Sequence, residues 1–298
     1  HESTHPNRVH PFNLQNELTS NDLNWNEITT KIKTNFRFQG TSAVSITAEQ
    51  HGTVTTSEEL LAALIAWENN KPQRLDLYVQ KLSATVAASL KKSKEPKEIT
   101  RAALLAWEMA SHPSHQQHLM SKEVLKGLVS ACSVSSFLAS GTSAGAISYI
   151  LHKAAPSLRD MLLQNGALFG LIKQLKNSKF PRASDEIVRL HAVSGLCREL
   201  DRTSPSAMLE MLSESSLSSD DVIRTLSLVC TTGTKDLVLQ TTCSVICRLL
   251  AAASPNSVIH VGTSLTYVNH PDCYKLGLWA LCTAARSNNV KALLSPHD

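Results

Sequence analysis

The sequence predicts an all-α protein, a right-handed α-solenoid in which about five to six similar helical units stack in series. Segments of similar pattern recur through most of the 298 residues. Apolar residues follow helical spacing between short polar breaks, and no long stretch alternates with the period of two that strands require. Aromatic residues make up only 5% of the chain, which favours helices with small interfaces over β-sandwiches.

The composition and charge argue against several classes of function. The formal net charge of +4 is mild, so a nucleic-acid partner is not favoured. The sequence contains no apolar run of about 18 residues, so we expect no membrane span. Seven cysteines is an odd number, and there is no Asn-x-Ser/Thr sequence. Both features favour a reducing compartment, and we expect a cytoplasmic or nuclear protein.

The chain divides into two regions by composition. Residues 1–55 differ from the rest, and His1–Asn35 is rich in Asn, Thr, His and Glu and poor in apolar residues. We expect a polar extension there, partly disordered or packed as a segment on the rest of the chain. Thr56 and Glu59 have the spacing of a capping box, which predicts that a helix begins there. Residues 56–298 are therefore expected to form the repeat domain.

Internal repetition is the strongest signal. Six segments share a pattern of a small residue, an apolar residue, a variable position, a second mostly small residue and a large residue. Their last residues are spaced about 43 apart on average, within the range of helical repeats. The small residues allow helices to approach closely, and the large residue fills the core. The segments are residues 63–67, 103–107, 146–150, 192–196, 242–246 and 277–281.

The units resemble armadillo repeats. Leu158–Lys176, which reads LRDMLLQNGALFGLIKQLK, is similar to the first and second helices of such a unit, and Gly277–Ala285 is similar to a third helix. The resemblance covers roughly residues 57–298. It is weakest over residues 201–235, where we expect irregular structure with Ser213–Ser219 as a loop. It implies a protein-interaction scaffold or adaptor that binds a partner segment, extended or helical, in a concave groove lined by the third helices.

Helical geometry identifies the candidate groove positions. At 100° per residue, His191, Ser194, Arg198 and Arg202 lie on the face opposite the apolar residues of their helix, and we expect that face to be open. Equivalent positions follow in the other units. The full set is Asn69, Met109, His152, His191, Ser194, Arg198, Arg202, Ser244, Arg248, Trp279 and Thr283.

The same positions indicate the chemistry of the partner. Importin-α-like members carry ladders of Trp and Asn in the groove, but here only Trp279 matches, with Thr283 at the Asn position. Arg198, Arg202 and Arg248 instead resemble the basic groove of catenin-like members, which implies an acidic partner segment. The planar guanidinium can bind a carboxylate through two hydrogen bonds. The alternative is that these arginines are ordinary solvated surface residues.

Two patterns suggest catalysis. Gly141–Gly145 matches the G-x-S-x-G motif, in which Ser143 would be a nucleophile, but that motif requires a preceding strand. We interpret the segment as a Ser/Gly loop between helices. His191 with Asp185 and Glu186 could supply acid–base groups, but a solvated helix face is the favoured explanation. We therefore expect no enzyme activity.

Cysteines and histidines raise the question of a metal site. Cys243 and Cys247 are four residues apart on an expected helix, and His260, His270 and Cys273 follow. No C-x-x-C pair exists, so the usual zinc spacing is not satisfied. Cys197, Cys247 and Cys282 each follow the large repeat residue, which favours structural thiols in the core. We expect neither a metal nor a cofactor.

Two alternative functions remain open. Residues 1–55 could act as an intramolecular or fused ligand that occupies the domain's own surface. A nucleic-acid-binding helical repeat is the second alternative, and steep weakening of binding with rising salt concentration would identify it. Oligomeric state and partner identity are outside what the sequence indicates.

Overall fold

The computed structural model describes residue 83 and residues 86–91, 95–111, 113–177 and 183–286. All described residues belong to one compact unit of the chain, Ile46–Asp298. The predicted N-terminal extension, the boundary at residue 56, the first repeat segment and Asn69 lie outside the described residues.

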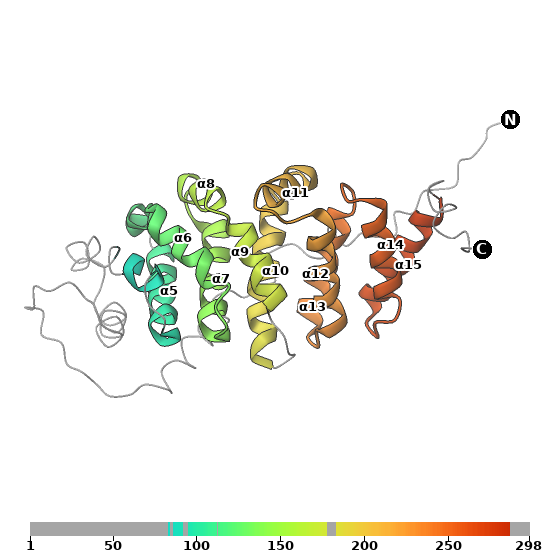
Figure 1. Ribbon diagram of the computed structural model, residues 1–298, viewed down its shortest axis with the longest axis horizontal. Helices are drawn as coiled ribbons and strands as arrows, with labels where there is room; N and C mark the ends of the chain where they lie inside the picture. The colour runs from blue at the N-terminus through green and yellow to red at the C-terminus, as the bar shows by residue number, and fades with distance from the viewer. Residues whose placement is uncertain (1–82, 84–85, 92–94, 112, 178–182, 287–298) are drawn as a thin grey trace, which may run out of the picture. The chain divides into compact units, whose positions relative to one another are not determined.

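All regular structure in the described ranges is helical, which confirms the predicted all-α class. Residues 86–91 form part of a helix, and twelve named helices follow within those ranges (Figure 1). They are α5 (Pro96–Ser111), the 3₁₀ helix η2 (Pro113–Leu119), α6 (Lys122–Ala131), α7 (Phe137–Lys153), α8 (Pro156–Gln164), α9 (Ala167–Asn177), α10 (Ala183–Leu200), α11 (Pro205–Glu214), α12 (Ser219–Thr232), α13 (Asp236–Leu249), α14 (Pro255–Leu265) and α15 (Pro271–Arg286).

Serine followed by proline starts two of these helices. The Ser204 hydroxyl accepts a hydrogen bond from the backbone N–H of Ala207 at 3.2 Å, and Ser254 does the same for Ser257 at 3.2 Å. In each helix proline occupies the first turn, where its missing N–H is not needed. These caps define where α11 and α14 begin.

Residues 201–235 are more regular than predicted. They contain α11 and α12, separated only by residues 215–218, so the expectation of an irregular region with a loop over Ser213–Ser219 was wrong. The Ser218 hydroxyl accepts from the Asp221 N–H at 3.1 Å and thereby caps α12. Ser216 has a positive φ of 65° in the turn. Serine in this segment therefore caps and connects helices rather than extending a loop.

The helices contact one another in two series. Helix α5 packs against α7, α7 against α10, α10 against α13, and α13 against α15. A second series runs from α6 to α9, α12 and α14. Figure 1 shows the members of the first series side by side, with α8 and α11 near one end of their neighbours. The five predicted repeat segments within the described residues all lie in helices of the first series.

Glycines allow close helix contacts within both series. A Cβ at Gly145 of α7 would lie 2.2 Å from the Trp107 ring of α5, and a Cβ at Gly141 would lie 2.3 Å from Val188 of α10. Gly141–Gly145 is therefore part of a helix interior, and the interpretation as a loop was wrong. Its glycines are required by the close packing of α7 against α5 and α10, whereas a nucleophile elbow lies on a turn between a strand and a helix.

Candidate functional site

The predicted groove residues within the described ranges belong to the first series of helices or to the turn after α10. Met109 lies in α5 and His152 in α7. His191, Ser194 and Arg198 lie in α10, and Arg202 follows it. Ser244 and Arg248 lie in α13, and Trp279 and Thr283 in α15.

Several of these positions do not face solvent as predicted. The exposed fraction is 0% for Met109 and His191, 1% for Ser194 and 6% for Arg198. Helix α10 contacts α7, α9 and α13, so little of its circumference remains open. The spacing of apolar residues within one helix indicates a single open face, but it does not indicate how many neighbouring helices pack around that helix. His152, Arg202, Ser244, Arg248, Trp279 and Thr283 retain at least partial exposure.

Arg202 connects the end of α10 to the end of α7. Its Nη1 donates to the backbone carbonyl of Leu151, and its Nη2 donates to the carbonyl of His152 at 3.1 Å. The last carbonyls of a helix have no partner within the helix and carry partial negative charge. Arg202 therefore satisfies the C-terminus of α7 from the next helix of the series.

Arg248 makes the equivalent connection one unit later. Its Nη2 donates to the carbonyl of Leu200, and its Nη1 donates to the Asp201 carboxylate at 2.8 Å and to the carbonyl of Cys197 at 3.4 Å. Arg198 lies 3.7 Å from the other Asp201 oxygen. The three arginines that the sequence suggested for partner binding thus already interact with the helix ends around Asp201 and His152.

Burial and neighbouring cations shape the electrostatics of this region. Desolvation, and then the charge of Arg198, lower the pKa of His152 to about 4. Complete burial alone lowers the pKa of His191 to about 4. Glu186 pairs with Arg189 at 3.2 Å, and both side chains are buried. The carboxylate of Glu186 is therefore held in an ion pair with Arg189.

A second cluster gathers three cysteines from three helices. Cys230 of α12, Cys243 of α13 and Cys273 of α15 are buried, and their Sγ atoms all lie within 4.8 Å of one another. The Sγ of Cys243 is 3.9 Å from that of Cys230 and 3.4 Å from that of Cys273. All three are free thiols. No other group of three or more potential metal ligands occurs within the described part of the chain.

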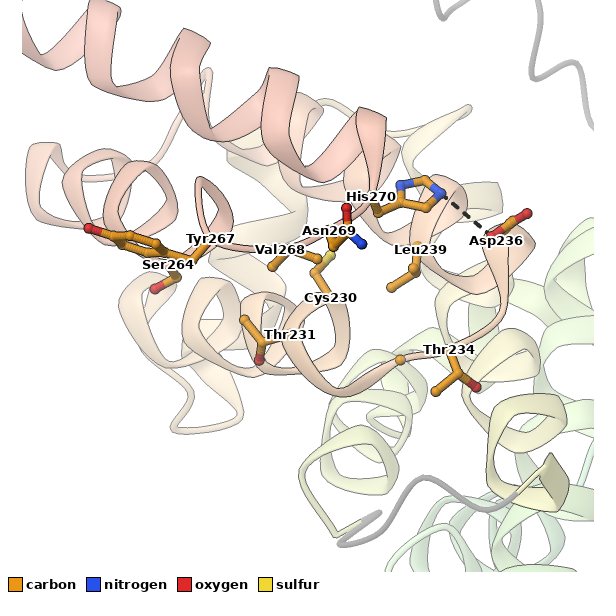
Figure 2. A pocket seen from close by; sticks show the side chains of 11 residues that line it. Cys230, Thr231, Thr234, Asp236, Leu239, Ser264, Tyr267, Val268, Asn269 and His270 are labelled. Carbon is orange, nitrogen blue, oxygen red and sulfur yellow. Dashed lines mark ion pairs between the residues drawn. The ribbon is translucent and has the colours of Figure 1, made fainter.

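His270 adjoins the cysteine cluster. It precedes α15 directly, and its side chain is 10% exposed. The Nε2 atom lies 3.8 Å from the carboxylate of Asp236, as Figure 2 shows, while the buried Nδ1 has no hydrogen-bond partner within the described residues. Hydrogen bonds with Cys230 and Cys243 are the largest cause that lowers the pKa of Cys273.

A cavity of about 450 Å³ opens beside the cluster. The turn between α12 and α13 and the turn between α14 and α15 form its walls, and Cys230, Asp236, Tyr267 and His270 are among its lining residues (Figure 2). Tyr267 is 88% exposed at its rim. The cavity gives solvent and small ions a route to the edge of an otherwise buried group of thiols.

Sequence reasoning identified only part of this cluster. It considered Cys243, His270 and Cys273 but grouped them with Cys247 and His260, and it did not include Cys230. The cluster depends on packing between α12, α13 and α15, which spacing along one helix does not report. Structural thiols in the core were expected at Cys197, Cys247 and Cys282; the first two are partly buried, whereas Cys282 is exposed, so the expectation is wrong there.

Neither a protein-family model nor a curated protein matches this sequence. Among the described residues, none of the helices combines the length and apolar character needed to span a bilayer.

Proposed function

We propose that the chain is an armadillo-type protein-interaction scaffold, with no catalytic role, that works in the cytoplasm or nucleus. The observation that carries this proposal is the serial packing of α5, α7, α10, α13 and α15, supported by a second series through α6, α9, α12 and α14. Units that contact only their neighbours form the extended surfaces that helical-repeat proteins use for binding. We infer a right-handed α-solenoid from this pattern together with the repeat segments.

The partner is proposed to be a protein segment that follows the exposed ends of the first series. Positions with some exposure there are His152, Arg202, Arg248, Trp279 and Thr283. The two arginines provide positive charge, so an acidic segment is the favoured ligand. Trp279 offers an aromatic anchor of the kind that dominates binding energy at protein interfaces.

The arginines are poor targets for a binding test because they also contact the ends of neighbouring helices. Charge reversal of Arg248 would remove hydrogen bonds to the carbonyls at the end of α10, and lost binding could then reflect lost folding. Trp279 and Thr283 on α15 are better targets. Trp279 is partly exposed and Thr283 is exposed. Thr283 donates only to the carbonyl of Trp279 on its own helix.

The test is affinity capture with the full chain as bait, beside the double variant Trp279→Ala/Thr283→Glu. The control is Arg224→Glu, a charge reversal at an exposed position of α12, in the second series. Unfolding temperatures of all three baits must agree within a few degrees. Proteins with acidic segments that are captured by the wild type and the control, but not by the double variant, would support the proposal. Equal capture by all three would refute the assignment of the binding face.

A further inference from the structure

We propose that Cys230, Cys243, Cys273 and His270 form a binding site for a zinc ion, with Asp236 orienting the histidine. This site is separate from the proposed partner-binding face and does not depend on it. Its ligands come from α12, α13 and the start of α15. A bound ion would therefore link α12, α13 and α15.

The spacing of the sulfur atoms fits a tetrahedral ion. Zinc–thiolate bonds of about 2.3 Å at tetrahedral angles place two sulfur ligands about 3.8 Å apart. The observed distances from Cys243 are 3.9 Å to Cys230 and 3.4 Å to Cys273, and all three sulfurs lie within 4.8 Å of one another. The third edge, from Cys230 to Cys273, is at most 4.8 Å, so movements of up to about 1 Å would make the three edges equal.

We assign the fourth ligand to His270, whose ring would have to move towards the sulfurs, because the ligand atoms that lie within 4.8 Å of one another are those of the three cysteines alone. Its side chain is nine-tenths buried, and its Nδ1 is a buried polar atom without a hydrogen-bond partner in the described structure. Such an atom is destabilising unless something binds it. His270 and Cys273 are separated by two residues, a spacing that zinc sites commonly use for a pair of ligands. The pair is H-x-x-C, so it does not match the C-x-x-C spacing considered above.

Asp236 occupies the position of an outer partner. Its carboxylate lies 3.8 Å from Nε2 of His270, on the opposite side of the ring from Nδ1. Histidines that bind zinc usually direct their second nitrogen to a carboxylate or carbonyl, which fixes the tautomer and orientation of the ring. Here that arrangement leaves Nδ1 as the atom available to the ion.

Zinc binding changes the protonation of the ligands. Zinc binds thiolates, so the three thiols release three protons as the ion enters, and His270 binds through its neutral ring. The first turn of α15 favours the thiolate of Cys273, because the free N–H groups there carry partial positive charge. With three thiolates and a histidine, the ion would have a closed set of ligands, as structural zinc sites have.

A disulfide is the competing explanation for close cysteines. Two of the three could be oxidised to a disulfide of about 2.0 Å, which would leave the third thiol and Nδ1 of His270 without partners. One ion satisfies all four groups together. The distances therefore favour metal binding, and the oxidised pair is retained as one outcome of the test.

The experiment measures zinc in the full chain purified under reducing conditions without chelators. We expect about one zinc per chain by elemental mass spectrometry. Cys243→Ala and Cys273→Ala should reduce that to background, and His270→Ala should weaken binding by 10-fold or more. Cys282→Ala, at an exposed thiol outside the cluster, is the matched control and should keep its zinc. Circular dichroism shows whether each variant folds.

A second measurement keeps the proposal falsifiable if the variants fail to fold. Co²⁺ added to the chelator-treated wild type should produce the thiolate charge-transfer and visible bands of a tetrahedral site, and Zn²⁺ should abolish them. A wild-type protein that contains no zinc and shows no cobalt bands would overturn the proposal. So would an intact mass two hydrogens below the reduced value, with no zinc bound, because it would identify an oxidised cysteine pair instead.

Discussion

The indole of Trp107 and the imidazole of His191 meet edge to face, with ring centroids 5.3 Å apart and planes at 89°. The contact joins α5 to α10, and both of these helices pack against α7. Trp107 also covers Gly145 of α7, so the three helices meet at one aromatic residue. Edge-to-face pairs of this kind contribute about 0.5–1.5 kcal/mol beyond the area they bury.

Burial of His191 predicts a pH-dependent stability. Its pKa falls from 6.5 to about 4 on folding, so the folded protein holds the ring neutral where the unfolded chain takes up a proton. The free energy of unfolding should therefore decrease as pH falls from 6.5 towards 4, by about 3 kcal/mol from this residue. Urea denaturation of the wild type and of His191→Gln at pH 7 and at pH 4.5 measures the effect.

The comparison isolates one histidine because His152 titrates in the same range but is present in both proteins. The variant should be less stable than the wild type at pH 7, since it loses the contact with Trp107. The difference between the two proteins should then shrink, or reverse, at pH 4.5. An identical pH dependence for both would contradict the assigned pKa of His191.

Close packing at Gly145 predicts an unusual response to alanine. Alanine normally stabilises a helix by about 1 kcal/mol relative to glycine. At Gly145 the added Cβ would lie 2.2 Å from the Trp107 ring, so we expect a loss of about 1–3 kcal/mol instead. The double variant Trp107→Leu/Gly145→Ala should show a smaller additional loss from the alanine, because leucine leaves room for it. A gain in stability for Gly145→Ala alone would rule out the tight contact.

The sequence was informative about repetition because each repeat segment has a local pattern. Small residues at fixed positions of the repeat segments indicate helices that approach their neighbours closely. Gly141 and Gly145, just before one of these segments, instead imitated a catalytic motif and were wrongly interpreted as a loop. The boundaries of α8 and α9 follow from Pro156 and from Gly166, whose φ of 85° suits glycine. Signals of this kind can be read from one sequence because they act within a few residues.

The candidate sites were harder to predict because they depend on contacts between units. Arg202 and Arg248 appear as surface cations in a helical wheel, yet their partners are carbonyls about 50 residues earlier in the chain. Cys230 joins Cys243 and Cys273 only when three helices pack together. No periodicity along one helix encodes either arrangement, and the burial of His191 has the same origin.

Two serines of α7 make a matched pair for a further prediction. Ser143 is fully buried, and its hydroxyl has no hydrogen-bond partner in the described structure, whereas the Ser148 hydroxyl donates to the backbone carbonyl of His191. Ser143→Ala should raise the free energy of unfolding by about 1 kcal/mol by removing an unsatisfied polar group. Ser148→Ala should lower it by about the same amount. Equal losses in the two variants would show that Ser143 has a partner or a role that packing does not explain.

Arg248 is expected to stabilise the junction between α10 and α13. Arg248 donates to the carbonyls of Leu200 and Cys197 at the end of α10 and pairs with Asp201, and the Cys197 carbonyl also accepts from the Asp201 N–H at 3.1 Å. Hydrogen bonds that involve a charged group contribute about 1.5–3 kcal/mol, so Arg248→Met should lower the free energy of unfolding by about 2 kcal/mol.

Arg224→Met, at an exposed position of α12, is the control and should change stability by less than about 0.5 kcal/mol. Arg248→Lys keeps the charge but loses the planar fork, so an intermediate loss is expected. Because Arg202 binds the end of α7 in the same way, Arg202→Met and Arg248→Met should have similar effects that add in the double variant. Loss of stability no larger than in Arg224→Met would mean that these arginines do not hold adjacent units together and remain available to a partner.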